Sequence, residues 1–452
     1  MSREDEELST LYVTKRAFRE VADAGRLTGR AIAVACRGVE TIVSGIKEKK
    51  MLQKIESENA KKRNVQEAGT QTAAQLNMDP FGNILLTGQI DRMELPILSS
   101  IFEGLHSQQC PVVVLHRENH QIESIVQQLG GVVINAANKR YDPFYNRSNF
   151  DIYKIVSSVC QGALSGIALK PEALQYITSM YMYIRQAKKS KLTLALCANC
   201  PHGDLLQRMT QEFASGKITQ LAYDEMSQAY MAGQGERFAL MSVFEELRKN
   251  GSSICFDGKK GRPYNIRDAI STASIIAISV PTPIALDMIA SEIDQEIIGG
   301  HRMVVCFDQI FINKNKTILS ILSQKTLNTV GGGSIIATND MMNMCSGDEK
   351  LFSDICSTMD TILLARHPNG RAVEQWSAFI GEYEKTERSW GNDSGSMRAK
   401  PWELFAGKHS GRNQTFSLKR ERILKQEDIT SLRDQEFYFI SKSRQQILKT
   451  SL

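Results

Sequence analysis

The sequence contains no apolar run that approaches the roughly 18 residues needed to span a bilayer. The longest early candidate, 31–36, is far too short. The N-terminus, Met-Ser-Arg-Glu-Asp-Glu-Glu, has no apolar core of the kind found in secretion signals. Ser, His and Asp residues occur without any spacing that indicates a hydrolase nucleophile. These absences predict a soluble protein and argue against a membrane span, a secretion leader and a catalytic triad.

Disulfide and zinc frameworks are also missing. The nine cysteines are an odd number, and most lie inside apolar runs, where a thiol acts as a small apolar side chain. With no secretion signal, this indicates a reducing cytoplasm. Cys197, Cys200 and His202 offer three closely spaced zinc ligands, but a closed site needs four and no second pair follows. Structural thiols are the favoured interpretation, so no metal is expected there.

What is present is ordinary for a globular protein. The 452 residues suffice for two or three domains, with 42% apolar and 23% charged residues. The net charge of +5 is mild and does not by itself imply nucleic acid.

Hydrophobic periodicity divides the chain into regions. Short apolar runs alternate with amphipathic stretches from about residue 80, which is typical of βαβ units with a parallel sheet, and resume after a long helical block. The prediction is an α/β fold, with a mostly parallel sheet flanked by helices, an all-α insertion and an N-terminal helical segment. Its parts are a helical segment (1–60), a polar linker (61–79), an α/β domain (80–164 and 263–452) and an all-α insertion domain (165–262). The N-terminal helices, small-residue-rich with basic flanks, are interpreted as packing or partner helices, with docking on a membrane surface as the alternative.

One predicted strand ends in an acidic residue. The run 303–311 delivers Asp308 and then Gln309. An acid at the carboxyl end of a buried strand can hold the magnesium ion of a nucleotide, and hydrolytic enzymes usually follow it with a glutamate that activates water. Gln309 can hydrogen-bond a water but cannot accept its proton.

A phosphate loop of the form Gly-x-x-x-x-Gly-Lys-[Ser/Thr] is only partly present after the first predicted strand. Thr87 and Gly88 stand where that strand ends, but Met93, Glu94 and Leu95 occupy the positions of the second Gly, the Lys and the hydroxyl residue. A glutamate in place of the lysine repels phosphate by roughly 4 kcal/mol per unit charge at about 4 Å and an effective dielectric of about 20. The alternative is that Gly88 is a turn glycine of an unrelated α/β fold.

Several segments, in order, resemble the TraG/TraD-type coupling proteins, the hexameric DNA-translocase ATPases of conjugation and type IV secretion. They are Gly88 after the first strand, the strand 110–119 with His116 where the family has Asp, Tyr141-Asp-Pro-Phe144, the helical block at about 165–262, the strand ending at Asp308, the run 332–340 with Thr338 and Asn339 in place of a nucleotide-sensing Gln, and the tail 419–440. The resemblance covers roughly 80–445, and it implies a RecA/P-loop-like fold.

This sequence also departs from the family. Members of the family usually begin with two membrane-spanning helices, and no such run is found here. We therefore expect a non-catalytic or weakly catalytic component of a conjugation or type IV secretion machine. It would be cytoplasmic, with a peripheral position at the inner face of the membrane left open. Implied partners are a relaxase or other subunits of the machine, with DNA and a homo- or hetero-oligomer, hexameric in the family, left open.

The expected site is a vestigial nucleotide site made of Thr87, Gly88, Asp308 and Gln309, with no catalytic residue. No cofactor is expected, since ATP and magnesium are disfavoured without the lysine and the glutamate. Two alternatives stay open: an active ATPase with a non-standard phosphate loop, completed by a partner, and a DNA-binding module. A basic cluster in 398–425 serves the second alternative, although a solvated face is favoured.

Overall fold

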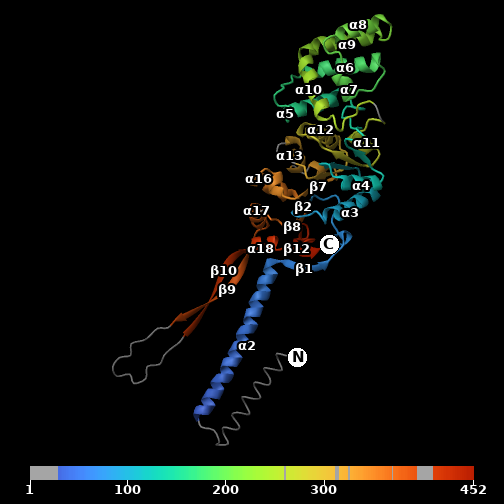
Figure 1. Ribbon diagram of the computed structural model, residues 1–452. Coiled ribbons are helices and arrows are strands. Elements are labelled where there is room, and N and C mark those ends of the chain that lie inside the picture. The colour runs from blue at the N-terminus through green and yellow to red at the C-terminus, as the bar shows by residue number, and fades with distance from the viewer. Residues whose placement is uncertain (1–28, 259–260, 311–314, 324–325, 369, 394–410) are drawn as a thin grey trace. The chain divides into compact units, whose positions relative to one another are not determined.

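The computed structural model describes residues 29–258, 261–310, 315–323, 326–368, 370–393 and 411–452, and the chain divides into two compact units (Figure 1). The larger unit spans 66–379 and 424–452, and the smaller one spans 1–65 and 380–423. Each unit is described below by itself. Residues 1–28 of the predicted N-terminal helical segment lie outside the described residues.

A ten-stranded sheet organises the larger unit, in the order β1-β12-β11-β8-β2-β7-β6-β3-β5-β4. The seven strands from β8 to β4 are parallel, and β11 is antiparallel to its neighbours β8 and β12. The strands are β1 (Val65–Thr70), β2 (Ile84–Thr87), β3 (Val112–His116), β4 (Val132–Ile134), β5 (Ile275–Ser279), β6 (Val304–Asp308), β7 (Gly333–Thr338), β8 (Thr361–Ala365), β11 (Glu436–Ser441) and β12 (Gln446–Ser451). The predicted α/β fold, with a mostly parallel sheet flanked by helices, is confirmed.

The central strands form because their sequences are apolar on both faces. Every residue of β2, β3, β5, β6, β7 and β8 is buried, which is the pattern of a parallel sheet covered by helices on both sides. The helices between these strands are α3 (Glu94–Ser107), α4 (His120–Gln128), α5 (Asn149–Gln161), α11 (Ile266–Ser271), α12 (Pro283–Ile298), α13 (Lys316–Ser323), α14 (Thr326–Thr329), α15 (Met341–Met344), α16 (Glu349–Thr358), α17 (Gly370–Ile380) and α18 (Gln426–Thr430).

A helical block separates β4 from β5. Within the described part of 165–262 it contains α6 (Ala173–Ala187), α7 (Leu194–Ala198), α8 (Leu205–Ala214), α9 (Gln220–Gly233) and α10 (Arg237–Asn250), and no strand longer than an isolated bridge. Gly233 ends α9, and Gly235 lies in the short 3-10 helix, Gln234–Glu236, that precedes α10. A Cβ on Gly233 would lie 2.3 Å from the Tyr176 nitrogen, so α9 and α6 pack too closely there for any side chain.

Two regions differ from the sequence prediction. Residues 61–79, predicted as a polar linker, contain the end of a long helix, the edge strand β1 and a 3-10 helix at Ala73–Leu76. A strand at the edge of a sheet remains largely exposed and tolerates polar residues, so its sequence carries no apolar alternation. At the C-terminal end of the sheet β12 follows β11, and no strand was predicted at β12.

The smaller unit consists of α2 (Gly29–Arg63) and a two-stranded antiparallel ribbon, β9 (Glu382–Asp393) and β10 (Gly411–Arg422). The sequence prediction placed 380–423 in the α/β domain. The carboxamide of Asn59 joins the helix to the ribbon, since it donates to the Thr386 carbonyl (3.0 Å) and accepts from the Thr386 N–H (2.9 Å). Arg63 Nε donates to the carbonyl of Ile423 just after β10, at 2.7 Å.

Candidate functional site

The carboxyl ends of four neighbouring strands bring the predicted site residues to one edge of the sheet. Thr87 of β2 pairs with Thr338 of β7, Ala337 of β7 pairs with Asp308 of β6, and Asp308 pairs with His116 of β3. In open α/β sheets this edge is where ligands usually bind. Thr87, Gly88, Asp308 and Gln309 therefore lie together at this edge.

The loop after β2 folds inward instead of forming a phosphate cradle. Ile90 and Met93 are buried, and α3 begins directly at Glu94. The loop's N–H groups donate to protein carbonyls, from Gly88 to Thr338 (3.3 Å), from Gln89 to Arg366 (2.8 Å), from Ile90 to Gly88 (2.8 Å), and from Met93 and Glu94 to Ile90 (2.8 and 2.9 Å). A phosphate loop needs such groups pointing at the ligand. In this chain these five are already occupied.

Gly88 adopts φ +100°, a conformation that residues with a side chain rarely take. A Cβ here would lie 2.7 Å from the Ala365 carbonyl oxygen and 2.8 Å from that of Arg366. The segment after β8 thus packs directly on the loop. His367, buried in the same segment, lies with its Nε2 3.3 Å from the Thr87 hydroxyl and its Nδ1 2.9 Å from the Ala365 carbonyl. Burial lowers the pKa of His367.

Glu94, at the position of the missing lysine, faces Asp308. Both side chains are buried, with exposed fractions of 7% and 1%. Burial, followed by the hydrogen bond to Asp308 and the charge of Asp308, raises the pKa of Glu94 to about 9. Glu94 Oε1 and Asp308 Oδ1 are buried without a hydrogen-bond donor, so a proton retained by Glu94 is the group that can bridge the two carboxyl groups. The carboxylate that would bind magnesium is therefore hydrogen-bonded to a protonated glutamate.

The other oxygen of Asp308 is also engaged. Asn119 Nδ2 donates to Asp308 Oδ2 at 3.0 Å, and the Asn119 N–H donates to His116 Nδ1 at 3.1 Å. Since Nδ1 accepts, the proton of neutral His116 is on Nε2, which lies 3.7 Å from Glu123. Burial lowers the pKa of His116, so the ring stays neutral despite the acids around it.

Gln309 and Asn339, at the ends of β6 and β7, are hydrogen-bonded to each other. Gln309 Nε2 donates to Asn339 Oδ1 (3.4 Å), and the Asn339 N–H donates to Gln309 Oε1 (3.3 Å). Gln309 has φ +53°, and its N–H donates to the Ala337 carbonyl. The two positions at which the family resemblance implies a water-activating and a nucleotide-sensing residue are thus paired with one another.

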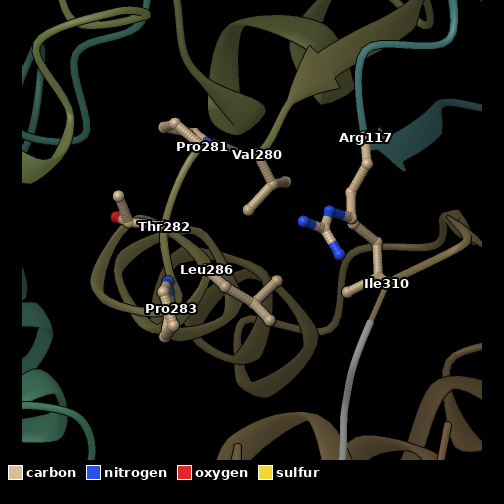
Figure 2. A pocket seen from close by; sticks show the side chains of 7 residues that line it. All are labelled: Arg117, Val280, Pro281, Thr282, Pro283, Leu286 and Ile310. Carbon is tan, nitrogen blue, oxygen red and sulfur yellow. The ribbon is translucent and has the colours of Figure 1, made fainter. Parts of the chain in front are cut away.

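A small cavity lies beside this edge (Figure 2). It has a volume of about 150 Å³ and is lined by Arg117, Val280, Pro281, Thr282, Pro283, Leu286 and Ile310. Typical small-molecule sites occupy about 300–1,000 Å³. This cavity is too small to hold a nucleotide.

The Tyr141–Phe144 segment has a structural role. The Tyr141 hydroxyl donates to Glu292 on α12 at 2.8 Å, and Asp142 accepts from the N–H of Leu194 at the start of α7 at 3.0 Å. Burial raises the pKa of Asp142 to about 7. Arg147, a few residues on, pairs with both Glu292 and Glu296. The segment anchors the helical block and α12 to the sheet.

The Cys197–His202 cluster shows no zinc geometry. His202 Nδ1 lies 2.9 Å from the Tyr176 hydroxyl and Nε2 lies 2.9 Å from the Cys197 carbonyl, so both ring nitrogens have partners. Throughout the described ranges, no group of three or more His, Cys, Asp or Glu residues is arranged to hold a metal ion.

Sequence reasoning missed several of these contacts. It located Glu94 but not its pairing with Asp308, and it did not single out Asn119 or His367. Asn119 could have been found from the sequence, because it directly follows a strand and precedes an amphipathic helix, where Asn is a favoured N-cap. Its side chain does accept from the N–H groups of Gln121 and Ile122. His367 follows β8 without any pattern that marks its role.

No family model and no curated protein matches the chain. Among solved structures it resembles the bacterial conjugative coupling protein TrwBdeltaN70 in its unbound form (14% identity, 85% of this chain and 87% of that one, TM-score 0.48). It also resembles the plasmid coupling protein TrwB in complex with ADP and Mg2+ (14%, 85% and 88%, TM-score 0.46) and VirB4 of Thermoanaerobacter pseudethanolicus (10%, 83% and 92%, TM-score 0.45). None of the described helices is long and apolar enough to cross a membrane. At such identities, the function of this chain has to be argued from its own residues.

Proposed function

We propose that this chain is a coupling-protein-like component of a conjugative DNA-transfer or type IV secretion machine that works without hydrolysing ATP. Its role would be to recruit a relaxase, another substrate or other subunits of the machine. The observation that carries the proposal is the pairing of Glu94 with Asp308 at the place where a lysine and a magnesium ion would otherwise meet.

The site lacks three features that ATP hydrolysis requires. The nucleotide needs N–H groups directed at its phosphates, a cation beside them and a carboxylate available to magnesium. The loop N–H groups donate to carbonyls, the cation is replaced by Glu94, and Asp308 accepts from Asn119 at Oδ2 and faces the carboxyl group of Glu94. A water-activating carboxylate is a fourth requirement, and Gln309 does not supply it.

The pathway rests on the order of motifs along the sequence. Gly88, Asp308, Thr338 and the Tyr141–Phe144 segment each resemble weak elements of the coupling-protein pattern, and the first three belong to adjacent strands of one sheet. All eight described cysteines are free and buried, which fits action in the cytoplasm.

A nucleotide titration tests the proposal. Thermal unfolding of the purified chain is expected to show no shift on addition of MgATP, and no phosphate is expected to be released. Measured turnover that Asp308→Ala abolishes, while the exposed-site control Asp434→Ala preserves it, would overturn the proposal and favour an active ATPase. Turnover that appears only with an added partner subunit, and requires Asp308, would favour the partner-completed alternative.

A gain-of-function variant tests whether Met93, Glu94 and Leu95 are what prevents ATP binding. Met93→Gly/Glu94→Lys/Leu95→Thr restores the pattern of a phosphate loop and frees Asp308 from its carboxyl partner. This variant is expected to gain an ATP-dependent thermal shift that the native chain lacks. The matched control Glu94→Gln keeps the hydrogen bond to Asp308 and is expected to gain none.

A DNA-binding module remains the second candidate. It predicts binding to duplex DNA that weakens linearly on a log–log plot against salt. Binding that is indifferent to salt would remove it.

A further inference from the structure

A second cavity lies between three helices of the larger unit, α5, α12 and α13 (Figure 1). It has a volume of about 500 Å³, and each of the three helices contributes residues to its wall. Typical small-molecule sites occupy about 300–1,000 Å³. This cavity, unlike the one beside the strand ends, is therefore large enough for a small ligand.

The wall of this cavity is polar. On α5 it is formed by Tyr153, Lys154, Ser157, Ser158 and Gln161, which recur every three to four positions and so share one face of the helix. Of the eleven residues that line the cavity, five are Ser or Thr and one is aliphatic. The opposite face of α5 carries the buried apolar residues of the helix. Short hydroxyl side chains thus replace apolar packing where the three helices meet, and they leave the space between them open.

Two of the lining residues carry a buried polar atom that has no hydrogen-bond partner. These atoms are Ser157 Oγ on α5 and Gln295 Oε1 on α12, and the two helices pack against each other. The Gln295 carboxamide is held from its other end, since Nε2 donates to the Asp151 carbonyl at 3.0 Å. A buried polar group left unpaired costs free energy, and native structures keep few of them. A bound molecule that supplied hydrogen bonds here would offset that cost.

Charge in the cavity is balanced. Lys154 and Asp294 are the charged residues among those that line it. Burial raises the pKa of Asp294, and the charge of Lys154 opposes that shift. An anion such as phosphate would meet the carboxylate, and a metal cation would meet the ammonium group. The cavity therefore favours an electrically neutral ligand.

Donors and acceptors of hydrogen bonds lie side by side on the wall. Hydroxyl groups do both, the Gln amides donate from one atom and accept at another, and Lys154 and Asp294 add a donor and an acceptor. A small, neutral ligand that is equally dense in groups of both kinds has the chemistry of a sugar. The ring of Tyr153 and the side chain of Ile298, which is 67% exposed, offer apolar surface to the C–H groups of such a ligand.

Two other ligand classes fit less well. An apolar cofactor needs a wall made mainly of apolar and aromatic side chains, and only Tyr153 and Ile298 are of that kind. An extended peptide is recognised through separate pockets for its alternate side chains, whereas the three helices enclose a single polar cavity.

We propose that the cavity between α5, α12 and α13 binds a carbohydrate, with Ser157 and Gln295 as two of its hydrogen-bond partners. The sugar is either a free monosaccharide or a unit of a glycan chain. This site goes beyond the proposed function and does not depend on the state of the nucleotide site. Failure of sugar binding would leave the closed site untouched, and ATP turnover would leave the cavity untouched.

Saturation-transfer NMR on the full chain tests the proposal. Glucose and N-acetylglucosamine are the probes for a free monosaccharide, and maltotriose is the probe for a glycan chain. Saturation transfer to at least one of these sugars is expected. Glucose 6-phosphate is expected to bind no more tightly than glucose, because Asp294 balances the charge of Lys154. Transfer to maltotriose alone would assign the site to a glycan chain.

Variants place the binding in the cavity. Ser157→Leu/Ser320→Leu fills it and should lower the affinity for the sugar at least about tenfold. Ser157→Ala removes one hydrogen-bond partner without adding volume and should lower the affinity about fivefold. The matched control Ser242→Leu/Ser353→Leu makes the same change at exposed positions of α10 and α16 and should leave affinity unchanged. Thermal unfolding verifies that each variant is folded.

The contrary results are equally definite. No saturation transfer to any of the three sugars would overturn the proposal. Transfer that both Ser157→Ala and the cavity-filling variant leave unchanged would also overturn it, because the sugar would then bind elsewhere. Tighter binding of glucose 6-phosphate than of glucose would contradict a neutral ligand and would assign the cavity to an anion.

Discussion

Glu94 with Asp308 and Glu292 with Glu296 are both pairs of buried carboxyl groups in the larger unit, but their surroundings are opposite in kind. Glu292 accepts from Arg147 (2.6 Å), from the Tyr141 hydroxyl (2.8 Å) and from the Ile266 N–H (2.9 Å). Every one of these neighbours is a donor. Glu94 has no such donor and meets another carboxyl group.

The difference shows how a buried acid is accommodated. Burial alone raises the pKa of both Glu94 and Glu292, because a charge is costly in a medium of low polarizability. At Glu292 a guanidinium and two further donors offset that cost, so the site can hold a carboxylate. At Glu94, keeping the proton costs less free energy than ionising the carboxyl group. The neutral Glu94 also places no second negative charge beside Asp308. Glu292 and Glu296 form a buried ion-pair network with Arg147, whereas Glu94 and Asp308 form a pair of carboxyl groups that share a proton.

The largest expected effect comes from removing Arg147, the cation that pairs with Glu292 and Glu296. Arg147→Met leaves two buried carboxyl groups without their partner and should lower the free energy of unfolding by about 3–5 kcal/mol. Arg267→Met is the control, because Arg267 contacts Glu296 from a side chain that is 37% exposed and should cost less than about 1 kcal/mol. Urea denaturation measures both. Equal costs for the two variants would contradict the anchor role.

The same isosteric change should act differently at the two sites. Glu292→Gln places an amide NH₂ among donors and should cost about 2–3 kcal/mol at about pH 7. Glu94→Gln donates to Asp308 as the protonated acid does, and should cost nothing. Urea denaturation of the two variants side by side is the measurement. A loss of stability in Glu94→Gln comparable to that in Glu292→Gln would show that Glu94 is ionised.

The proton on Glu94 also predicts a dependence on pH. Its pKa is raised from 4.5 to about 9 in the folded chain, so the folded state keeps a proton that the unfolded state releases in between. The stabilising contribution is complete below about pH 4.5 and is lost as pH rises toward about 9, by at most about 1.4 kcal/mol per pH unit. Glu94→Gln should lack this component, so its stability advantage over the native chain should grow with pH. Parallel curves from about pH 6 to about pH 8.5 would rule out the shared proton.

The smallest effect is expected at Gln309. Gln309→Glu restores the acid that activates water but leaves the loop N–H groups and Asp308 engaged, so no ATP turnover should appear. Stability should change by less than about 1 kcal/mol, because the substitution loses only the 3.4 Å bond to Asn339 Oδ1. Phosphate release and urea denaturation test the two parts. Turnover in this variant would mean that Gln309 alone had silenced the site.

Much of the sheet could be predicted from the sequence, and the reason is physical. Strands buried on both faces are continuous apolar runs, so β2, β3, β6, β7 and β8 are recognisable without a structure. The edge strand β1 and the ribbon strands β9 and β10 are polar or carry charge on exposed faces, so the same signal is missing there. Their pairing depends on contacts such as that of Asn59 with Thr386, which join residues far apart in the chain.

The strand ends at this edge of the sheet could be predicted, but the contacts made there could not. Strand ends located Thr87, Gly88, Asp308 and Gln309, because parallel strands finish at one edge. Whether Glu94 would repel a ligand or occupy its place depended on where α3 begins and on how closely it packs against β6. That is a tertiary property, and no local pattern encodes it.

Gly88 has a consequence for how relatives of this chain diverge. With carbonyl oxygens of Ala365 and Arg366 within 2.8 Å of any added Cβ, selection for a folded chain is enough to keep glycine at this position. Among relatives with the same packing, the glycine should persist while the positions of Met93, Glu94 and Leu95 drift. A glycine kept by packing in this way carries no information about catalysis.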